Sequence, residues 1–477
     1  MANDSMLKFV DRGQDYPAKR TADARIEDFA EIAARYAAPT AEDQAGRCSQ
    51  CGVPYCSVHC PLHNHIPDWL RLTAEGRLRE AYELSNSTST MPEICGRICP
   101  QDRLCEGNCV IEFSGHGAVT IGSVEKFITD TAWEEGWVEP LVAGPSRGQS
   151  VAVIGAGPAG LSAAEYLRVG GYDVHVYDRH DRAGGLLTYG IPGFKLEKPV
   201  VMRRVDRLKA GGIVFHEGFA VGEDATLDDL RQRHDAVLIA TGVYRARALD
   251  VPGATDTTTL AALDFLTASN RKGFGDAVPA FDDGTLDAAG KHVVVIGGGD
   301  TAMDCVRTAI RQGAASVKCL YRRDRANMPG SQREVANAEE EGVEFVWLSA
   351  PAAIEDDGTV RVRKMRLGQP DASGRRAPEP DPTGDVVIAA DLVIKALGFD
   401  AEDLPTLWGA PELAVSRWGT VLVDGKTLMT SLDGVFAAGD IVRGASLVVW
   451  AIRDGRDVAA TMHRWLKAKA SAGRKAA

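Results

Sequence analysis

An α/β fold preceded by a helical domain is what the 477 residues of this chain predict, on two observations. Eight of the ten cysteines fall between Cys48 and Cys109, in a first third that has no strand–glycine turn–helix pattern. Beyond residues 142–150 that pattern occurs twice, which is typical of two dinucleotide-binding units in tandem. We expect a helical domain over residues 1–145, one Rossmann-like unit over 146–285 and 396–477, and a second over 286–395.

The first third is expected to be helical because its apolar residues recur at three- and four-residue spacing. One helix is predicted over residues 25–37 and another over residues 68–84. The positions that set the spacing are Ile26, Phe29, Ala33 and Tyr36 or Ala37 in the first, and Leu70, Ala74, Leu78 and Tyr82 in the second.

Charge and composition exclude several classes of protein. A formal net charge of −12 argues against nucleic acid as a partner, because binding phosphates needs a positive face. The N-terminus carries charge where a signal peptide has its apolar stretch, and no segment approaches the roughly 20 apolar residues of a membrane span. We therefore expect a cytoplasmic protein, in which clustered cysteines are more often metal ligands than disulfides.

The spacing of the cysteines favours iron–sulfur clusters. Successive cysteines are separated by two, four and three residues, and then, from Cys95 to Cys109, by three, five and three. Eight thiols exceed the two C-x2-C pairs of a structural zinc site, and thiolates bind cluster iron well. Two [4Fe-4S] clusters are the favoured interpretation, and a double zinc-binding module is the alternative. Cys305 and Cys319, in the second α/β unit, are expected to be small apolar residues.

The first α/β unit opens with the strand VAVI followed by GAGPAG at residues 155–160. In this context the glycines allow a tight turn, and backbone amides at the helix N-terminus face a pyrophosphate. Asp178 ends the next strand, where a carboxylate accepts hydrogen bonds from a ribose. The alternative is a glycine turn that serves packing, with an unrelated Asp.

The second unit differs at the matching place. It carries GGGDTA at residues 297–302, and its second strand ends in Arg322 and Arg323 where an acid would suit a free ribose hydroxyl. Guanidinium groups pair with a 2′-phosphate, so this strand end favours NADPH over NADH. A solvated basic loop is the alternative.

Near the C-terminus, VFAAGD combines a buried strand with Gly439 and Asp440, ahead of a long amphipathic helix. Such an Asp can bind the ribityl chain of a flavin, and the positive end of a helix dipole can stabilise a reduced flavin. GD turns are common, so alone this signal is modest.

Taken in order, these motifs resemble those of the small (β) subunits of bacterial NADPH-dependent glutamate synthases over nearly the whole chain. The segments that carry the resemblance are the cysteine pattern, GAGPAG, GGLLTYGIPGFKL at residues 184–196, ATG, GGGDTAMD and VFAAGD. The same module resembles part of dihydropyrimidine dehydrogenase and subunits of electron-bifurcating ferredoxin–NADP oxidoreductases. The resemblance implies a helical bis-[4Fe-4S] domain followed by adrenodoxin-reductase-like FAD and NADPH domains.

The resemblance also implies the residues that hold each group. One cluster would take Cys48, Cys51, Cys56 and Cys109, and the other Cys60, Cys99 and Cys105 with Glu125, which leaves Cys95 over. FAD would contact Gly155, Gly157, Pro158, Ala159, Gly160, Asp178, Gly185, Leu186, Thr241, Gly242, Gly439 and Asp440. NADPH would contact Gly298, Gly299, Asp300, Thr301, Arg322 and Arg323.

The implied activity is an electron relay from NADPH through FAD and the clusters to a large (α) subunit, in a hetero-oligomer. That subunit would form glutamate from glutamine and 2-oxoglutarate. This chain starts Met-Ala-Asn, without a cysteine to serve as an N-terminal amidotransferase nucleophile, so we expect it not to form glutamate alone. The alternatives are an NADPH dehydrogenase that feeds ferredoxin, a hydrogenase or another reductase, and a scaffold with purely structural clusters.

Overall fold

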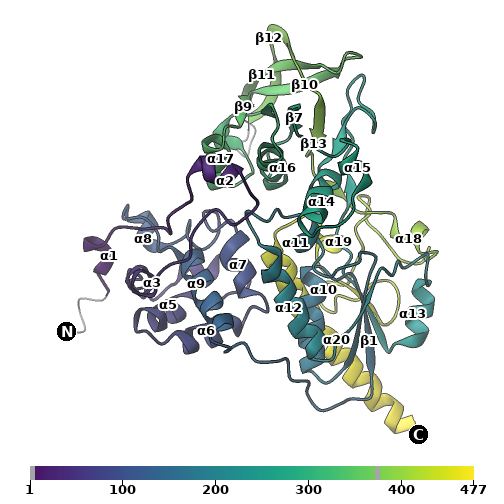
Figure 1. Cartoon of the computed structure of the whole chain (residues 1–477). Coiled ribbons are helices and arrows are strands. Elements are labelled where there is room, and N and C mark those ends of the chain that lie inside the picture. Colours follow the sequence, from purple (N-terminus) through teal and green to yellow (C-terminus); the bar gives the residue numbers. More distant parts are fainter. Residues whose placement is uncertain (1–5, 371–375, 477) are drawn as a thin grey trace.

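The computed structural model describes residues 6–370 and 376–476, as a helical unit joined to two α/β units (Figure 1). The rest of the predicted domains, at residues 1–5, 371–375 and 477, lies outside the described residues. The helical unit consists of α1 (Lys8–Asp11), α2 (Ala22–Ile26), α3 (Ala38–Ala45), α4 (Tyr55–Val58), α5 (Ile66–Ala74), α6 (Leu78–Asn86), α7 (Pro92–Ile98), α8 (Val110–Phe113) and α9 (Ile121–Glu134).

The helix predicted over residues 68–84 is in fact two helices, α5 and α6. Gly76 interrupts them with φ +73°, a left-handed conformation that suits glycine and ends α5. Both helices pack on α9 around the fully buried Trp69, so the predicted apolar face is buried although the helix is broken.

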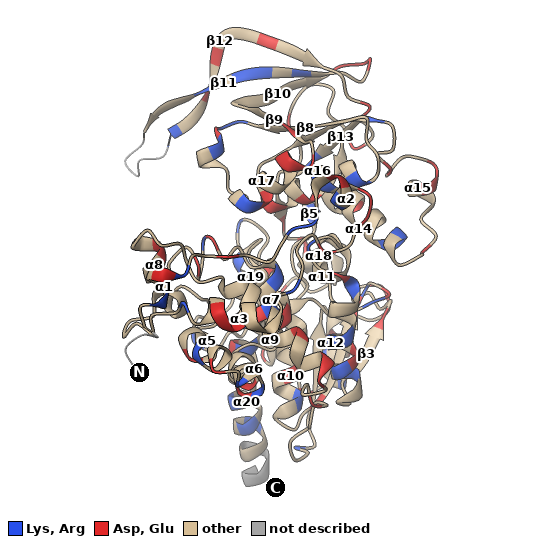
Figure 2. Cartoon of the chain, turned by 60° about the vertical axis from the view of Figure 1, so that its left-hand side comes forward, with Lys and Arg blue, Asp and Glu red and all other residues tan. Residues whose placement is uncertain are grey.

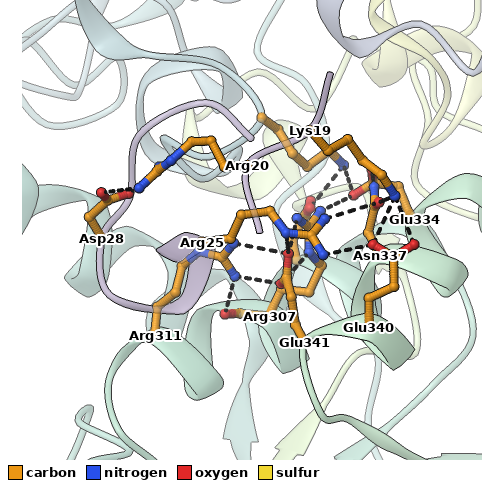
Figure 3. A network of polar contacts seen from close by, with 12 residues as sticks. Lys19, Arg20, Arg25, Asp28, Arg307, Arg311, Glu334, Asn337, Glu340 and Glu341 are labelled. Carbon is orange, nitrogen blue, oxygen red and sulfur yellow. Dashed lines mark hydrogen bonds and ion pairs between the residues drawn. The ribbon is translucent and has the colours of Figure 1, made fainter. Parts of the chain in front are cut away.

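The helix predicted over residues 25–37 is wrong beyond Ile26: only α2 is helical, and the chain then continues irregularly to α3, with one antiparallel bridge from Ala33 to Lys19. Polar side chains stabilise this path. Asp28 accepts hydrogen bonds from Arg20 at 2.7 and 2.6 Å and from the backbone of Ala30. Arg25 is buried against the second α/β unit, where Nη2 lies 2.7 Å from Glu340 (Figure 3). These contacts compete with the hydrogen bonds of a helix, so the spacing of the apolar residues predicted a longer helix than the one that forms.

The first α/β unit is a five-stranded parallel sheet in the order β15-β4-β1-β2-β3. Helices α10 and α20 pack against each other beside it, and α20 extends past the sheet to the C-terminus (Figures 1 and 2). Its elements are β1 (Ser150–Ile154), α10 (Pro158–Val169), β2 (Asp173–Asp178), α11 (Leu186–Tyr189), α12 (Lys198–Ala210), β3 (Val214–Glu217), α13 (Leu227–Arg233), β4 (Ala236–Ile239), α18 (Leu404–Leu407), β15 (Val435–Ala437), α19 (Asp440–Arg443) and α20 (Val448–Ala476).

The second α/β unit is also a five-stranded parallel sheet, in the order β6-β13-β7-β8-β9. An antiparallel sheet, β10-β11-β12, extends from it, and β5 pairs with β14. Its strand β6 and helix α14 precede residue 286, where the sequence placed the start of this unit. The elements are β5 (Arg245–Ala246), β6 (Leu260–Ala261), α14 (Ala262–Gly273), α15 (Pro279–Asp282), β7 (His292–Ile296), α16 (Asp300–Arg311), β8 (Ser316–Tyr321), η1 (Arg325–Asn327), α17 (Gln332–Glu340), β9 (Glu344–Trp347), β10 (Ser349–Ile354), β11 (Val360–Pro370), β12 (Arg376–Ile388), β13 (Leu392–Lys395) and β14 (Phe399–Asp400).

The helices were also compared with the length and apolarity that crossing a lipid bilayer requires. None of those in residues 6–370 and 376–476 meets both requirements.

Candidate functional site

One group of cysteines in the helical unit shares a cavity. Cys48, Cys51, Cys56 and Cys109 line it together, from the loops around α4 and from the residue that precedes α8. Burial raises the pKa of the Cys48 and Cys56 thiols to about 12, because the thiolate loses solvation there. The structure therefore brings together all four cysteines that the sequence assigned to one cluster.

A second group surrounds α7 and α9. The pKa of Cys99 is raised, first by a hydrogen bond with Cys95 and then by burial. The pKa of Cys105 is raised by burial, with further contributions from Cys60 and Glu125. Burial also raises the pKa of Glu125 to about 8, and Ser85 Oγ donates to its Oε1 at 3.2 Å. The predicted set is thus gathered, and Cys95, which the sequence left over, lies beside it.

The donors in both groups fit iron–sulfur clusters. Most of the donors are cysteine sulfurs, which as thiolates are soft ligands for iron. Burial disfavours the thiolates of Cys48, Cys56, Cys60 and Cys105 until a positively charged group offsets their charge. In the part of the chain that the structure describes, there is no group of three or more His, Cys, Asp or Glu side chains arranged to bind a single metal ion.

The glycine fingerprint of the first unit forms a tight turn against the end of β4. Gly155 has φ +108°, and a Cβ there would lie 2.4 Å from the carbonyl oxygen of Ala240. Asp178 accepts the Ala156 N–H at 2.6 Å and the His180 N–H at 2.8 Å, so its carboxylate orients the turn. The turn leads directly into α10, whose N-terminus is suited to a pyrophosphate.

Two further predicted glycines approach the same turn. A Cβ at Gly185 would lie 2.9 Å from the Cα of Gly157, and one at Gly439 would lie 2.9 Å from the Cβ of Ala159. Leu186 begins α11 at this place, and Thr241 and Gly242 follow β4 at the same sheet edge. The structure therefore brings the FAD residues predicted in five separate segments to one edge of the sheet.

Asp440 fits a flavin because one of its polar atoms is buried without a partner. Its Oδ1 makes no hydrogen bond, and burial raises the pKa of the carboxyl to about 6. A ribityl hydroxyl is a group that would satisfy this oxygen, so Asp440 offers an acceptor of the kind that the predicted cofactor needs.

Replacing Asp440 by Asn should stabilise the flavin-free protein but weaken FAD binding. The raised pKa means that ionised Asp440 opposes folding as the pH rises above its ordinary value of 3.8, fully so above about 6. The variant should gain about 3 kcal/mol near pH 7.5 and nothing near pH 3.5. Calorimetry of flavin-free protein at several pH values measures this gain, and a gain independent of pH would contradict it.

The second unit repeats the glycine turn with different neighbours. A Cβ at Gly297 would lie 2.3 Å from the carbonyl oxygen of Ala396, and one at Gly298 would lie 2.4 Å from the ring of Tyr321. Gly299 precedes α16, whose first residues are Asp300 and Thr301. The turn and the helix N-terminus therefore have the form that a nucleotide pyrophosphate needs.

The two predicted arginines lie just after β8, next to this turn. Arg322 is exposed, and the Nε of Arg323 is buried without a hydrogen-bond partner. Arg325, by contrast, is held by Glu339 at 2.8 Å. The strand end therefore carries guanidinium groups available to a 2′-phosphate.

Sequence reasoning missed two residues that connect the units at this site. Lys195, in the loop after α11, lies 2.9 Å from Asp304 of α16. Arg103, in the turn between Cys99 and Cys105, lies 3.3 Å from Asp300. Neither contact has a local sequence signal, because each joins segments more than a hundred residues apart in the chain.

Comparison with known proteins agrees with this architecture. Residues 25–137 match the family model "dihydropyrimidine dehydrogenase domain II, 4Fe-4S cluster", and residues 149–455 match "pyridine nucleotide-disulphide oxidoreductase". The structure of FprA from Mycobacterium tuberculosis in complex with NADPH is similar, with a TM-score of 0.57 and 20% identity, over 68% of this chain and 86% of FprA. That likeness confirms the predicted adrenodoxin-reductase-like fold of the α/β units.

Two curated relatives match nearly the whole chain. The glutamate synthase (NADPH) small chain of Azospirillum brasilense is 65% identical over 475 residues, which are 99% of this chain and 98% of that protein. The putative oxidoreductase AegA of Escherichia coli is 45% identical over 463 residues, 95% of this chain and 70% of AegA.

Proposed function

Because the chain belongs to the family of glutamate synthase (NADPH) small chains, we propose that it delivers electrons from NADPH, through FAD and two [4Fe-4S] clusters, to a large chain. The large chain would form L-glutamate from L-glutamine and 2-oxoglutarate. Membership of the family makes the chain an electron-transfer oxidoreductase with a 4Fe-4S domain and FAD and NADP units. In this proposal FAD binds at the glycine turn of the first α/β unit and NADPH at that of the second.

The observation that carries the proposal is that one chain holds two separate groups of cysteines together with two nucleotide-type glycine turns. When bound, FAD accepts a hydride from NADPH and the clusters pass its electrons on singly. The residues of the chain bind and orient these groups: Asp178 orients the first turn, Asp440 offers an acceptor to the flavin, and α16 offers its N-terminus to the nucleotide.

The decisive experiment is anaerobic reconstitution of the holoprotein with the large chain, with assay of NADPH-, glutamine- and 2-oxoglutarate-dependent glutamate formation. We expect glutamate only when both chains are present. Glutamate formation by the small chain alone, or none with both chains fully loaded, would contradict the proposal.

A second candidate function is an NADPH dehydrogenase that feeds ferredoxin or another reductase. The similarity to AegA favours keeping it, because a putative oxidoreductase shares this module at 45% identity. Rapid reduction of added ferredoxin, together with failure to bind the large chain, would favour this function. Failure of NADPH to reduce bound FAD would exclude both enzymes.

The surface beside the first thiol cavity suits an acceptor protein. Between Arg47 and Asp68 no residue is charged, although a quarter of the whole chain is. Tyr55, Val58 and Phe113 are exposed there at 47%, 54% and 69%. Uncharged apolar surface of this kind is typical of the centre of a protein interface, and it borders the four cysteines that would hold a cluster.

Changing Val58 to Asp is expected to weaken binding of the large chain by roughly 10- to 100-fold, because a charge would be buried in the interface. Reduction of ferricyanide by NADPH should be unchanged. Leu422→Asp is the matched control, since Leu422 is 50% exposed on the first α/β unit. Equal affinity of the wild-type protein and Val58→Asp in sedimentation would rule out this surface.

A further inference from the structure

An arginine of the helical unit reaches the nucleotide turn of the second α/β unit. Arg103 lies in the turn between Cys99 and Cys105, and its side chain is 43% exposed. Its Nη1 donates to the carbonyl oxygen of Pro329, and its Nη2 lies 3.3 Å from Oδ2 of Asp300. Arg103 therefore contacts the first residue of α16, where the pyrophosphate of a nucleotide would bind.

Asp300 is an unfavourable neighbour for that pyrophosphate. The N-terminus of a helix attracts anions, but a carboxylate in the first helical turn repels them. Its Oδ1 accepts the backbone N–H of Ser331 at 2.9 Å, which fixes the carboxylate at the turn without removing its charge. The nearby backbone is tightly arranged as well, because Gly330 N–H donates to the Gly298 carbonyl at 2.9 Å. A cation is needed beside Asp300 if an anion is to bind here.

We propose that Arg103 completes the NADPH site from the helical unit, as a positioning residue for the pyrophosphate. Its guanidinium neutralises Asp300 and has five N–H groups, of which the contacts with Pro329 and Asp300 leave others for a phosphate oxygen. The inference rests on the proposed function, because it takes NADPH to be the nucleotide of the second unit. It adds that the site is complete only when the helical unit is docked.

Two flanking contacts hold the Arg103 turn in place. Ser331 Oγ lies 3.3 Å from Asp102 Oδ2, and Arg333 Nη2 lies 2.5 Å from Glu106 Oε2. Arg333 is 41% exposed, close to the exposure of Arg103, and it crosses the same interface without contacting α16 in these hydrogen bonds. Arg333→Gln disturbs the interface at least as much as Arg103→Gln, because it leaves the buried Glu106 without its cation, yet it keeps the charge beside Asp300 and so serves as a stringent control.

The test is calorimetric titration of NADP⁺ and of NAD⁺ into the oxidised, full-length holoprotein. Arg103→Gln should weaken both nucleotides by about tenfold or more, because both contain the pyrophosphate. The ratio of their affinities should stay as in the wild-type protein, unlike after changes at Arg322. Arg333→Gln should bind both within about twofold of wild type, and Arg103→Lys should keep most of the affinity.

Removing the opposing charge gives an independent test. Arg103→Gln combined with Asp300→Asn should recover part of the lost affinity, because the unpaired carboxylate is gone although the guanidinium is still missing. The direction for Asp300→Asn alone separates the two roles, since breaking a merely structural ion pair from the Asp300 side would weaken binding. Asp300→Asn alone should bind both nucleotides more tightly than wild type, and this single variant decides the matter if Arg103→Gln fails to retain FAD and iron.

The outcomes separate the two levels of inference. If wild-type protein binds neither nucleotide, the proposed function is wrong. If it binds NADP⁺ and Arg103→Gln binds it equally well, or Arg333→Gln loses as much affinity, the role of Arg103 is wrong and the proposed function stands. No rescue by Asp300→Asn would also overturn the role of Arg103.

Discussion

Replacing Arg322 and Arg323 together by alanine is expected to lower kcat/KM for NADPH by roughly 10²- to 10³-fold and to leave kcat/KM for NADH within a few-fold. Each charge-assisted hydrogen bond to a 2′-phosphate contributes about 1.5–3 kcal/mol, and NADH has no such phosphate. The structure places both residues directly after β8, with Arg322 exposed and the Nε of Arg323 lacking a partner.

The matched control for this prediction is Arg325→Ala, in the same loop. Arg325 is bound by Glu339, so its removal should change kcat/KM for NADPH by about threefold at most. Steady-state rates with both nucleotides, at fixed ionic strength and a saturating artificial acceptor, give the comparison. Equal losses for NADPH and NADH in the double variant would show that these arginines stabilise the loop and do not recognise the 2′-phosphate.

The parts of the site that the sequence predicted are those set by local backbone chemistry. Glycine turns after apolar strands depend on conformations available mainly to glycine, so Gly155 and Gly297 could be located from the sequence. The four cysteines that the family resemblance assigns to one cluster line one cavity. The fold class was confirmed in the same way, because strand–turn–helix repeats specify it with little help from distant residues.

The parts that could not be predicted depend on contacts between distant segments. Residues 27–37 have helical apolar spacing, yet Arg25 is bound by Glu340 and Asp28 by Arg20, which favours an irregular path. The contact of Arg103 with Asp300 joins two domains, and neither residue stands out in its own segment. The spacing of apolar residues predicts a helix only when the apolar face of that segment packs on its neighbours. A polar contact between two domains leaves no such spacing in the sequence.

Two residues, Glu125 and Cys95, are candidates for the fourth ligand of the second cluster. Cys95 packs with Leu62, Met91 and Ile94, and its Sγ lies 3.9 Å from Ser89 Oγ. Glu125 is buried with Ser85 as its hydrogen-bond partner and a pKa of about 8. Positive charge from adjacent iron would offset the unfavourable burial of this carboxylate, so we propose Glu125 as the ligand.

Glu125→Ala should therefore lose one cluster, whereas Cys95→Ser should keep both. Iron should fall from about eight to about four atoms per chain in the first variant only, because each cluster holds four. Electron transfer to the large chain should be abolished in Glu125→Ala, while reduction of FAD by NADPH continues, since hydride transfer precedes the clusters. Iron analysis and electron paramagnetic resonance of anaerobically purified protein give the answer. The reverse pattern, with iron lost in Cys95→Ser and retained in Glu125→Ala, would make Cys95 the ligand and leave Glu125 as a buried acid whose burial needs another explanation.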